Sequence, residues 1–270
     1  MKREFIGKVA LVTGSSKGIG KDIAIGLANH GADVIVNYFS DKDGALDTKC
    51  KVEAFGRQCI AVRADVGRFD DVKNMYEITY AKFGRVDILI NNSAVAIWKA
   101  FEDFSEDDWD STLNTNLKSI FLCSQMALPS MKKNKGGVII NIGSMGGHAY
   151  MNHLVPYCTS KGGVNLITKS LAVELAKYNI RVNCVSPGTI AVARNFNLDP
   201  DYPENWFPFI PQGKIGLLKE VTDPVIFLCS KEALHITGQI IYIDGGTTCY
   251  IPMPGSHHPK SVKGSRRKCL

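Results

Sequence analysis

Residues 8–20 read KVALVTGSSKGIG, an apolar run followed at once by a glycine-rich turn. The run Lys8–Thr13 predicts a β-strand, and a helix is expected to begin at Gly18. Glycine at positions 14, 18 and 20 lets the backbone turn tightly and approach a ligand closely. The N-terminus of the helix would then face that ligand with unpaired N–H groups, which favour a phosphate. The turn predicts a phosphate-binding loop, although its G-x3-G-x-G spacing differs from the G-x-G-x-x-G dinucleotide fingerprint and a purely structural turn is the alternative.

Short β-branched runs alternate with longer helical segments along the chain, as in successive βαβ units. The predicted strands are Lys8–Thr13, Asp33–Tyr38, Gln58–Ala64, Val86–Asn91, Gly137–Ile142, Arg181–Ser186 and Gln239–Ile243. The predicted helices are Gly18–His30, Asp70–Phe83, Asp110–Lys133, Tyr157–Tyr178 and Glu220–Ser230. Several strands are continuously apolar, which is expected when helices cover both faces of a parallel sheet. The pattern predicts a single, doubly wound α/β domain over residues 1–250, followed by a basic extension over residues 251–270.

Composition and charge exclude several classes of function. The chain has 270 residues, of which 45% are hydrophobic and 21% charged, as in a packed globular domain. Its formal net charge is +6, but the last twenty residues hold five basic residues and no acid, which leaves about +1 for the rest. A near-neutral body with a basic tail is not the charge pattern of a nucleic-acid groove. We expect no nucleic-acid partner and no membrane span, because no run approaches the roughly 20 apolar residues that a span needs.

The eight cysteines include no C-x-x-C pair and no metal-ligand spacing. They are interpreted as reduced and mostly buried thiols, and no metal site is predicted. The apolar run Val9–Val12 near the start is too short for a secretory signal. We expect a cytoplasmic protein.

One segment, Thr189–Gly213, departs from the alternating pattern. It is rich in proline and aromatic residues, and an irregular loop of this length in a compact domain is usually functional or disordered. We interpret it as a substrate lid. Its aromatic part, Tyr202–Phe209, is expected to form an apolar face of the substrate site together with Trp98, Met145 and Val155.

Tyr157 and Lys161 lie four residues apart in a predicted helix and therefore project from the same face. A tyrosine hydroxyl normally titrates near pH ~10, too high for efficient proton transfer at neutral pH. A neighbouring ammonium stabilises the phenolate and lowers that pKa. The pair alone is a weak signal, because Y-x-x-x-K also occurs as an ordinary pair on a helix surface.

The turn TGSSKGIG resembles the T-G-x3-G-x-G cofactor loop of the short-chain dehydrogenase/reductase family. The resemblance continues in register over roughly residues 5–248, through Asp65, Asn91-Asn92-Ser93-Ala94, Asn116, Ser144, Tyr157, Lys161 and Pro187-Gly188. It implies a Rossmann fold with seven parallel strands in the order 3-2-1-4-5-6-7. It also implies a catalytic set of Asn116, Ser144, Tyr157 and Lys161.

The family's chemistry implies a role for each member of this set. In reduction, hydride passes from the nicotinamide to the carbonyl carbon while Tyr157 protonates the oxygen, which Ser144 holds by a hydrogen bond. Lys161 lowers the pKa of Tyr157 and binds the ribose of the nicotinamide. Asn116 positions a water in a proton relay that runs from Lys161 to solvent.

The resemblance implies a nicotinamide cofactor, with Asp65 and Val66 at the adenine and Asn91 beside its ribose. The residues expected to contact the cofactor are Gly14, Ser16, Lys17, Gly18, Ile19, Gly20, Asn37, Ser40, Asp65, Val66, Asn92, Tyr157, Lys161, Pro187, Gly188 and Ile190. NADP(H) is the expected cofactor, because the second strand ends on Asn37 and not on an acid that would repel a 2′-phosphate. Lys17, with Ser16 and Ser40, is expected to bind that phosphate. Use of NAD(H) as well is the alternative.

The sequence departs from the family pattern at two places. The usual N-N-A-G after the fourth strand reads Asn91-Asn92-Ser93-Ala94, so the backbone approach to the cofactor is slightly fuller. The threonine expected three residues after Thr189, a contact of the nicotinamide carboxamide, is Val192. That contact is therefore expected to come from a backbone amide or from Thr189.

The expected function is NADP(H)-dependent interconversion of a secondary alcohol and a ketone with an apolar face, such as an acyl or polycyclic ketone, by a homotetramer. Two alternatives keep the same chemistry. The end of the second strand, Val36–Ser40, with Asp244-Gly245-Gly246 and Tyr250, also resembles sugar dehydrogenases of the glucose 1-dehydrogenase kind, and the 3-oxoacyl carrier-protein reductases are the other. A non-catalytic sensor of nicotinamide redox state is the alternative from another class. His148 and His153 could line the pocket, but no G-x-S-x-G elbow supports a serine hydrolase.

Overall fold

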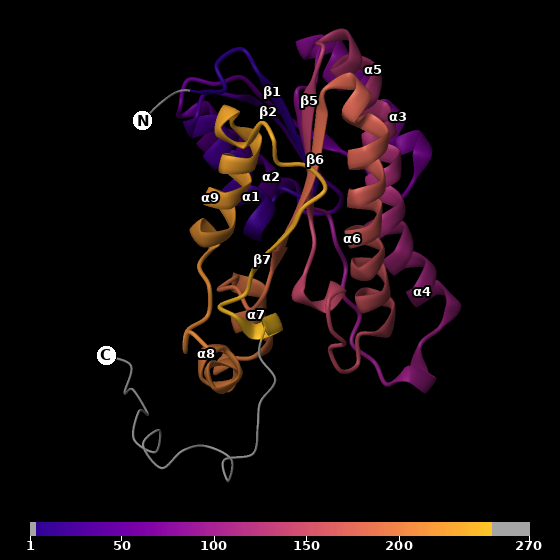
Figure 1. The fold of residues 1–270 in the computed structure, drawn as a ribbon, viewed down its shortest axis with the longest axis vertical. Coiled ribbons are helices and arrows are strands. Elements are labelled where there is room, and N and C mark those ends of the chain that lie inside the picture. The colour runs from indigo at the N-terminus through magenta and orange to yellow at the C-terminus, as the bar shows by residue number, and fades with distance from the viewer. Residues whose placement is uncertain (1–3, 250–270) are drawn as a thin grey trace.

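A computed structural model describes residues 4–249, and the basic extension 251–270 and Tyr250 lie outside the described residues. Seven parallel strands form one sheet in the order β3-β2-β1-β4-β5-β6-β7, which confirms the predicted fold class (Figure 1). The strands are β1 (Val9–Val12), β2 (Asp33–Tyr38), β3 (Cys59–Arg63), β4 (Ile88–Asn91), β5 (Gly137–Ile142), β6 (Ile180–Pro187) and β7 (Ile240–Ile243). All seven fall within two residues of their predicted bounds, and the largest difference is at β4, which begins at Ile88 and not at Val86.

Helices cover both faces of the sheet and bury two separate apolar cores (Figure 1). One face carries α1 (Gly18–Asn29), α2 (Lys42–Glu53) and α9 (Leu218–Cys229). The other carries α3 (Phe69–Phe83), α5 (Ser119–Lys133) and α6 (Val155–Leu175). Successive residues of β1 alternate between these cores, so the whole strand is buried and reads as continuously apolar.

The structure corrects the prediction at three places. Helix α2 was not predicted, because its sequence is rich in lysine and aspartate and carries Gly44. The predicted helix Asp110–Lys133 is two helices, α4 (Glu106–Leu113) and α5, joined by a π-helical turn over Asn114–Lys118. The segment Thr189–Gly213 is less irregular than predicted, because it contains the short helices α7 (Ala193–Leu198) and α8 (Tyr202–Trp206).

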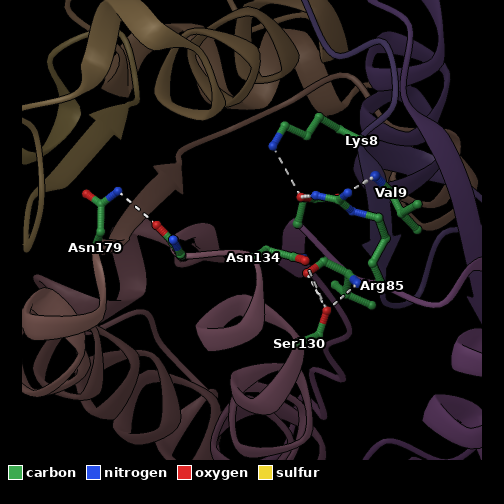
Figure 2. A network of polar contacts seen from close by, with 9 residues as sticks. Lys8, Val9, Arg85, Ser130, Asn134 and Asn179 are labelled. Carbon is green, nitrogen blue, oxygen red and sulfur yellow. Dashed lines mark hydrogen bonds and ion pairs between the residues drawn. The ribbon is translucent and has the colours of Figure 1, made fainter.

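A network around Asp87 ties strands together at the amino edge of the sheet (Figure 2). Asp87 is 4% exposed and accepts hydrogen bonds from the backbone N–H of Val9 at 3.0 Å, from Lys8 Nζ at 3.2 Å and from Arg85 Nε at 2.7 Å. Nearby, Ser130 Oγ accepts from the backbone N–H of Val86 at 2.9 Å. The charged network thus lies at the edge opposite the glycine turn, where it supports the fold.

Replacing Asp87 by alanine is expected to lower the free energy of unfolding by about 3 kcal/mol, because it leaves the backbone of Val9 unpaired and removes a buried, paired carboxylate. Lys8→Met is the matched control. It is expected to cost under about 1 kcal/mol, because the ammonium is largely solvated. Equilibrium unfolding in urea measures both, and equal effects for the two variants would contradict this account of the network.

Candidate active site

The glycine turn lies at the carboxyl edge of the sheet, between the ends of β1 and β4, where the strand order reverses direction. Crevices at such a reversal are the usual binding sites of open α/β sheets. Gly14 and Gly18 have φ of +59° and +58°, conformations that side chains rarely adopt. A Cβ on Gly20 would come within 2.4 Å of Asn92 Nδ2 and 2.6 Å of the Gly14 oxygen. Glycine is therefore required at position 20 and favoured at positions 14 and 18.

Helix α1 begins directly after this turn and has no side-chain cap. Its residue at the N-cap is Lys17, and its first turn contains no acid. The first N–H groups of a helix lack partners within the helix, and they favour an anion. These residues therefore fit the pyrophosphate of a dinucleotide cofactor, as the sequence predicts.

Asn92 and Thr13 fasten the turn to the end of β4. The amide of Asn92 donates to the Thr13 and Gly14 oxygens at 2.9 and 3.0 Å, and Thr13 Oγ1 accepts from the backbone N–H groups of Asn92 and Ser93. Asn92 was predicted to contact the cofactor. In the structure its amide instead holds the loop that would contact the cofactor.

The side chain of Asn37, one of the predicted cofactor contacts, turns inward. It is 1% exposed, its Oδ1 accepts from the backbone N–H of Gly14 at 3.0 Å, and its Nδ2 donates to the Ala64 oxygen at 3.1 Å. Both ends of this amide form hydrogen bonds within the protein and hold the glycine turn. The side chain is too buried to contact a phosphate. The backbone N–H of Gly14 requires a hydrogen-bond acceptor within the protein, and Asn37 near the end of β2 provides it.

Several other predicted contacts have side chains that are buried or that already form hydrogen bonds within the protein. The amide of Asn91 donates to Asn141 Oδ1 at 2.9 Å inside the sheet. The side chains of Val66 and Ile190 are 4% and 3% exposed and belong to the two cores. The carboxylate of Asp65 accepts from the backbone N–H of Gly67 at 2.9 Å, within its own turn.

The remaining predicted contacts lie in the crevice or at its edge. Ser16 is buried, whereas Ile19 packs partly against the core. Pro187 ends β6, and the N–H of Gly188 donates to the Ile243 oxygen at 2.9 Å. A Cβ on Gly188 would meet Asp244 Cβ at 2.7 Å, so this glycine allows the chain to pack against the end of β7.

Two exposed cations lie at the end of the crevice beyond β2. Lys17 is exposed and forms no ion pair within residues 4–249. Arg63, which the sequence reasoning missed, pairs in register with Tyr38, and its Nε donates to the Phe39 oxygen at 3.1 Å. The guanidinium lies 5.9 Å from the centroid of the Phe39 ring. The parallel register of the predicted strands was the signal that could have placed Arg63 there.

Ser144, Tyr157 and Lys161 come together beyond the end of β5. Ser144 follows β5 and accepts from the backbone N–H of Gly146 at 3.0 Å, whereas Tyr157 and Lys161 lie in the first two turns of α6. Lys161 Nζ is 5.7 Å from the centroid of the Tyr157 ring. It donates to the Ile142 oxygen at 2.8 Å, which anchors the ammonium below the tyrosine.

Burial controls the charge of this group of residues. Burial raises the pKa of Tyr157, and the Ser144 hydroxyl and the Arg194 guanidinium both oppose that rise. Burial lowers the pKa of Lys161 to about 8, because the ammonium has no carboxylate to offset its desolvation. In the cofactor-free protein the site therefore holds a buried ammonium beside a neutral phenol, and the pKa of Tyr157 is raised above its ordinary value, not lowered as the sequence predicts.

Asn116 occupies the π-helical turn and is 1% exposed. Its Oδ1 accepts from the backbone N–H of Val95 at 2.8 Å, and its Nδ2 donates to the Val95 oxygen at 2.9 Å and to Ser160 Oγ at 3.0 Å. The side chain joins the loop after β4 to α6 and makes no contact with Lys161. None of these hydrogen bonds runs to Lys161, and the relay role of Asn116 stays a prediction.

Two adjoining cavities of about 510 Å³ each lie over these residues. They share the side chains of Trp98, Met145, Met151 and Trp206. One is lined by Ser144 and Tyr157, and Tyr202 and Arg194 also line it from the predicted lid. The expected apolar face is present, although Val155 lines neither cavity.

The other sequence features have simpler places. His148 packs edge-on against Tyr242 with ring centroids 5.5 Å apart, and neither His148 nor His153 lines the two cavities. Val192 caps α7 with no side-chain hydrogen bond. Within residues 4–249 the cysteines are free thiols and no cluster suits a metal ion. The helices of that part of the chain are also too short or too polar to cross a bilayer.

A family model described as enoyl-(acyl carrier protein) reductase matches residues 14–248. The chain belongs to the short-chain dehydrogenase/reductase family. The 3-oxoacyl-(acyl-carrier-protein) reductase FabG of Staphylococcus epidermidis is 38% identical over 245 residues, which are 89% of this chain and 99% of that protein. Glucose 1-dehydrogenase 2 of Bacillus subtilis is 35% identical over 253 residues, 93% of this chain and 98% of that protein.

Among solved structures, acetoin dehydrogenase YohF from Salmonella typhimurium has a TM-score of 0.84 and 35% identity, covering 91% of this chain and 97% of that one. A short-chain alcohol dehydrogenase from Sinorhizobium meliloti, described as putative, has a TM-score of 0.87 and 35% identity, covering 93% of this chain and all of that one. This short-chain dehydrogenase/reductase is therefore an oxidoreductase that acts on CH–OH groups with a nicotinamide cofactor.

Proposed function

We propose that this enzyme interconverts a secondary alcohol and a ketone with NADP(H), using Tyr157 as the proton donor and acceptor. The observation that carries the proposal is that Ser144 and Tyr157 line an aromatic cavity with the buried amine of Lys161 directly behind them. A phenol, a hydroxyl and an amine in this arrangement can hold a carbonyl oxygen and deliver a proton to it.

The bound nicotinamide supplies the hydride, and the protein's residues supply the proton and the orientation. Ser144 donates a hydrogen bond to the carbonyl oxygen and fixes it within reach of the Tyr157 hydroxyl. Tyr157 gives its proton to that oxygen as negative charge develops there. The ammonium of Lys161 stabilises the resulting phenolate, and its anchor on the Ile142 oxygen keeps it in place.

The substrate that we propose has an apolar body. Trp98, Trp206 and Phe209 give one cavity a largely apolar wall, and Tyr202 extends it. Buried area of this kind binds an acyl chain or a ring system. A sugar has fewer apolar groups to place against it, so the glucose-type alternative is the weaker of the two.

The preference for NADP(H) rests on the charge around the end of β2. Lys17 and Arg63 are exposed there, and the one carboxylate within residues 38–41, Asp41, accepts from the backbone N–H of Gly44 as the N-cap of α2. Ser40 is exposed beside it as a further donor. Two cations with free donors fit a 2′-phosphate, whereas a ribose hydroxyl needs neither.

Lys17→Glu and Arg63→Glu are each expected to raise the KM for NADPH about tenfold or more, because each replaces a charge-assisted hydrogen bond with repulsion. The KM for NADH is expected to change less than about threefold. Lys82→Glu, an exposed site on α3, controls for the change in net charge. A tighter KM for NADH than for NADPH in the unaltered enzyme would refute the preference.

The function itself is tested by following nicotinamide absorbance with NADPH and with NADH over β-ketoacyl thioesters, polycyclic ketones, acetoin and glucose. Turnover of one class that Tyr157→Phe abolishes supports the proposal. Tight cofactor binding with no turnover of any carbonyl or alcohol would favour the sensor alternative.

We also propose a homotetramer. Exposed Trp109, Phe121, Leu166 and Val173 on α4, α5 and α6 offer apolar surface for association. Light scattering on the full chain measures the assembly, and a monomer at micromolar concentration would refute it.

A further inference from the structure

The cavity over Tyr157 contains an arginine that the proposed chemistry does not use. Arg194, in α7, lines it together with Ser144 and Tyr157. Its only hydrogen bond within residues 4–249 runs from Nη2 to the Ala96 oxygen at 3.3 Å, and it forms no ion pair there. A guanidinium has five N–H donors, so most of its capacity is open to a ligand.

The one carboxylate that lines the same cavity does not neutralise it. Asp199 accepts from Asn205 Nδ2 at 3.2 and 3.0 Å and from the backbone N–H of Asp201 at 3.1 Å. Both of its oxygens are held by α8 and by Asp201, the residue at the N-cap of that helix. Arg194 is therefore the one cation that lines this cavity; it forms no ion pair with Asp199, and the other lining residues are aromatic, aliphatic or neutral polar.

We infer that Arg194 binds the carboxylate of the substrate, so that the substrate is an oxo acid with an apolar body. This inference rests on the proposed function and names its substrate class. The ketone oxygen lies against Ser144 and Tyr157, the body lies between Trp98 and Trp206, and the carboxylate takes the donors of Arg194. A planar guanidinium matches a carboxylate with two parallel hydrogen bonds, which favours this anion geometrically.

A phosphate of the cofactor is the other anion that a guanidinium could bind. No residue of the glycine turn lines the cavity of Arg194, and the cations Lys17 and Arg63 lie at the end of β2. The structure therefore favours the substrate, and the experiment separates the two sources.

The kinetic test compares each oxo acid with its own methyl ester. The pairs are 2-oxo-4-phenylbutanoate and 4-oxo-4-phenylbutanoate with their esters, assayed with NADPH. We expect kcat/KM to favour at least one acid over its ester by about tenfold or more, the range expected of hydrogen bonds to charged groups. In Arg194→Met that ratio is expected to fall to near one, and in Arg194→Lys to an intermediate value. Lys82→Met removes the same charge at a distance and is expected to keep the ratio.

A binding test does not depend on turnover. Trp98 and Trp206 line the cavity, so quenching of tryptophan fluorescence reports occupancy when 3-phenylpropanoate or 3-phenylpropanamide is added to the full chain. We expect the acid to bind more tightly than the amide, and the difference to vanish in Arg194→Met.

The outcomes separate this inference from the proposed function. Turnover of ketones with no preference for acids, and no preference for the acid in the quenching test, overturns the inference and leaves the function intact. Acid binding that needs Arg194 without turnover of any ketone refutes the function and keeps the anion site. If Arg194→Met weakens NADPH binding about tenfold and leaves the acid-to-ester ratio unchanged, the guanidinium binds the cofactor and the inference is wrong.

Discussion

Replacing Tyr157 by phenylalanine is expected to lower kcat for ketone reduction by about 10³-fold, because it removes a proton donor whose contribution is of the order of 10²–10⁴-fold. The ring and its packing stay, so the cavity keeps its shape. The affinity for NADPH is expected to change less than about threefold, because the variant keeps the glycine turn and Lys161. Steady-state rates from nicotinamide absorbance and a fluorescence titration of NADPH measure the two quantities separately.

Tyr202→Phe is the matched control for this experiment. Tyr202 lines the same cavity, but the hydroxyl that interacts with Ser144 is that of Tyr157, so Tyr202 is not placed to share a carbonyl oxygen with Ser144. Its loss is expected to change kcat less than about tenfold. If Tyr157→Phe retained more than about a tenth of the activity, or if the two variants fell equally, the assignment of Tyr157 as the general acid would be wrong.

The strands and the glycine turn could be predicted because their signals are local. An apolar run of four to six residues followed by glycines identifies a buried strand and its turn without any knowledge of the rest of the chain. Helix α2, which was missed, and helices α4 and α5, which were merged, lack such signals. Helix α2 is mostly polar, and the apolar pattern runs through the π-helical turn at Asn114–Lys118 without a break.

The orientation of polar side chains at the strand ends could not be predicted in the same way. Both faces of the sheet are covered, so the alternation along β2 does not show whether Asn37 faces a ligand or the core. The buried N–H of Gly14 needed an acceptor, and the residue that supplies it is 23 positions away in the sequence. The amides of Asn91 and Asn92 are directed to other protein groups for similar reasons. Their amides satisfy Asn141 and the glycine turn, which only the folded sheet brings near.

Arg194 is the opposite case, a residue that the sequence did not single out and that the fold brings to the cavity. Its segment is short and irregular in the sequence, and the sequence reasoning treated it as part of an aromatic lid. Only the folding of α7 over the end of β4 brings the guanidinium to Ala96 and to the wall shared with Tyr157.

Lys161→Met is expected to lower kcat by about 10²-fold or more and, at the same time, to stabilise the cofactor-free protein. The loss of rate follows because the phenolate of Tyr157 loses the ammonium that stabilises it. The gain in stability follows from burial, which lowers the pKa of Lys161 from its ordinary value of 10.5 to about 8. That shift corresponds to a cost of about 3 kcal/mol for holding the charged form in the fold, at 1.36 kcal/mol per pKa unit.

The sign of this cost fixes its pH dependence. Below about pH 8 the lysine is protonated in both the folded and the unfolded state, so the folded state bears the whole cost. Between about pH 8 and 10.5 the unfolded state binds more protons, and the stability of the unaltered protein rises with pH as the cost is removed. Methionine has no charge to bury, so its stability lacks this rise.

Urea unfolding of the cofactor-free proteins tests this account. At about pH 7 the methionine variant is expected to be more stable by about 1–3 kcal/mol, the lower figure allowing for the lost hydrogen bond to the Ile142 oxygen. At about pH 9.5 the difference is expected to shrink by half or more, because most of the cost has then been removed. Lys82→Met, at an exposed site, is expected to change stability by under about 0.5 kcal/mol at both pH values. A methionine variant that is less stable at neutral pH, or a difference that does not narrow as the pH rises, would show that the fold holds the Lys161 ammonium without cost. Such a result would also mean that burial does not lower the pKa of Lys161 toward the range in which it exchanges protons at neutral pH.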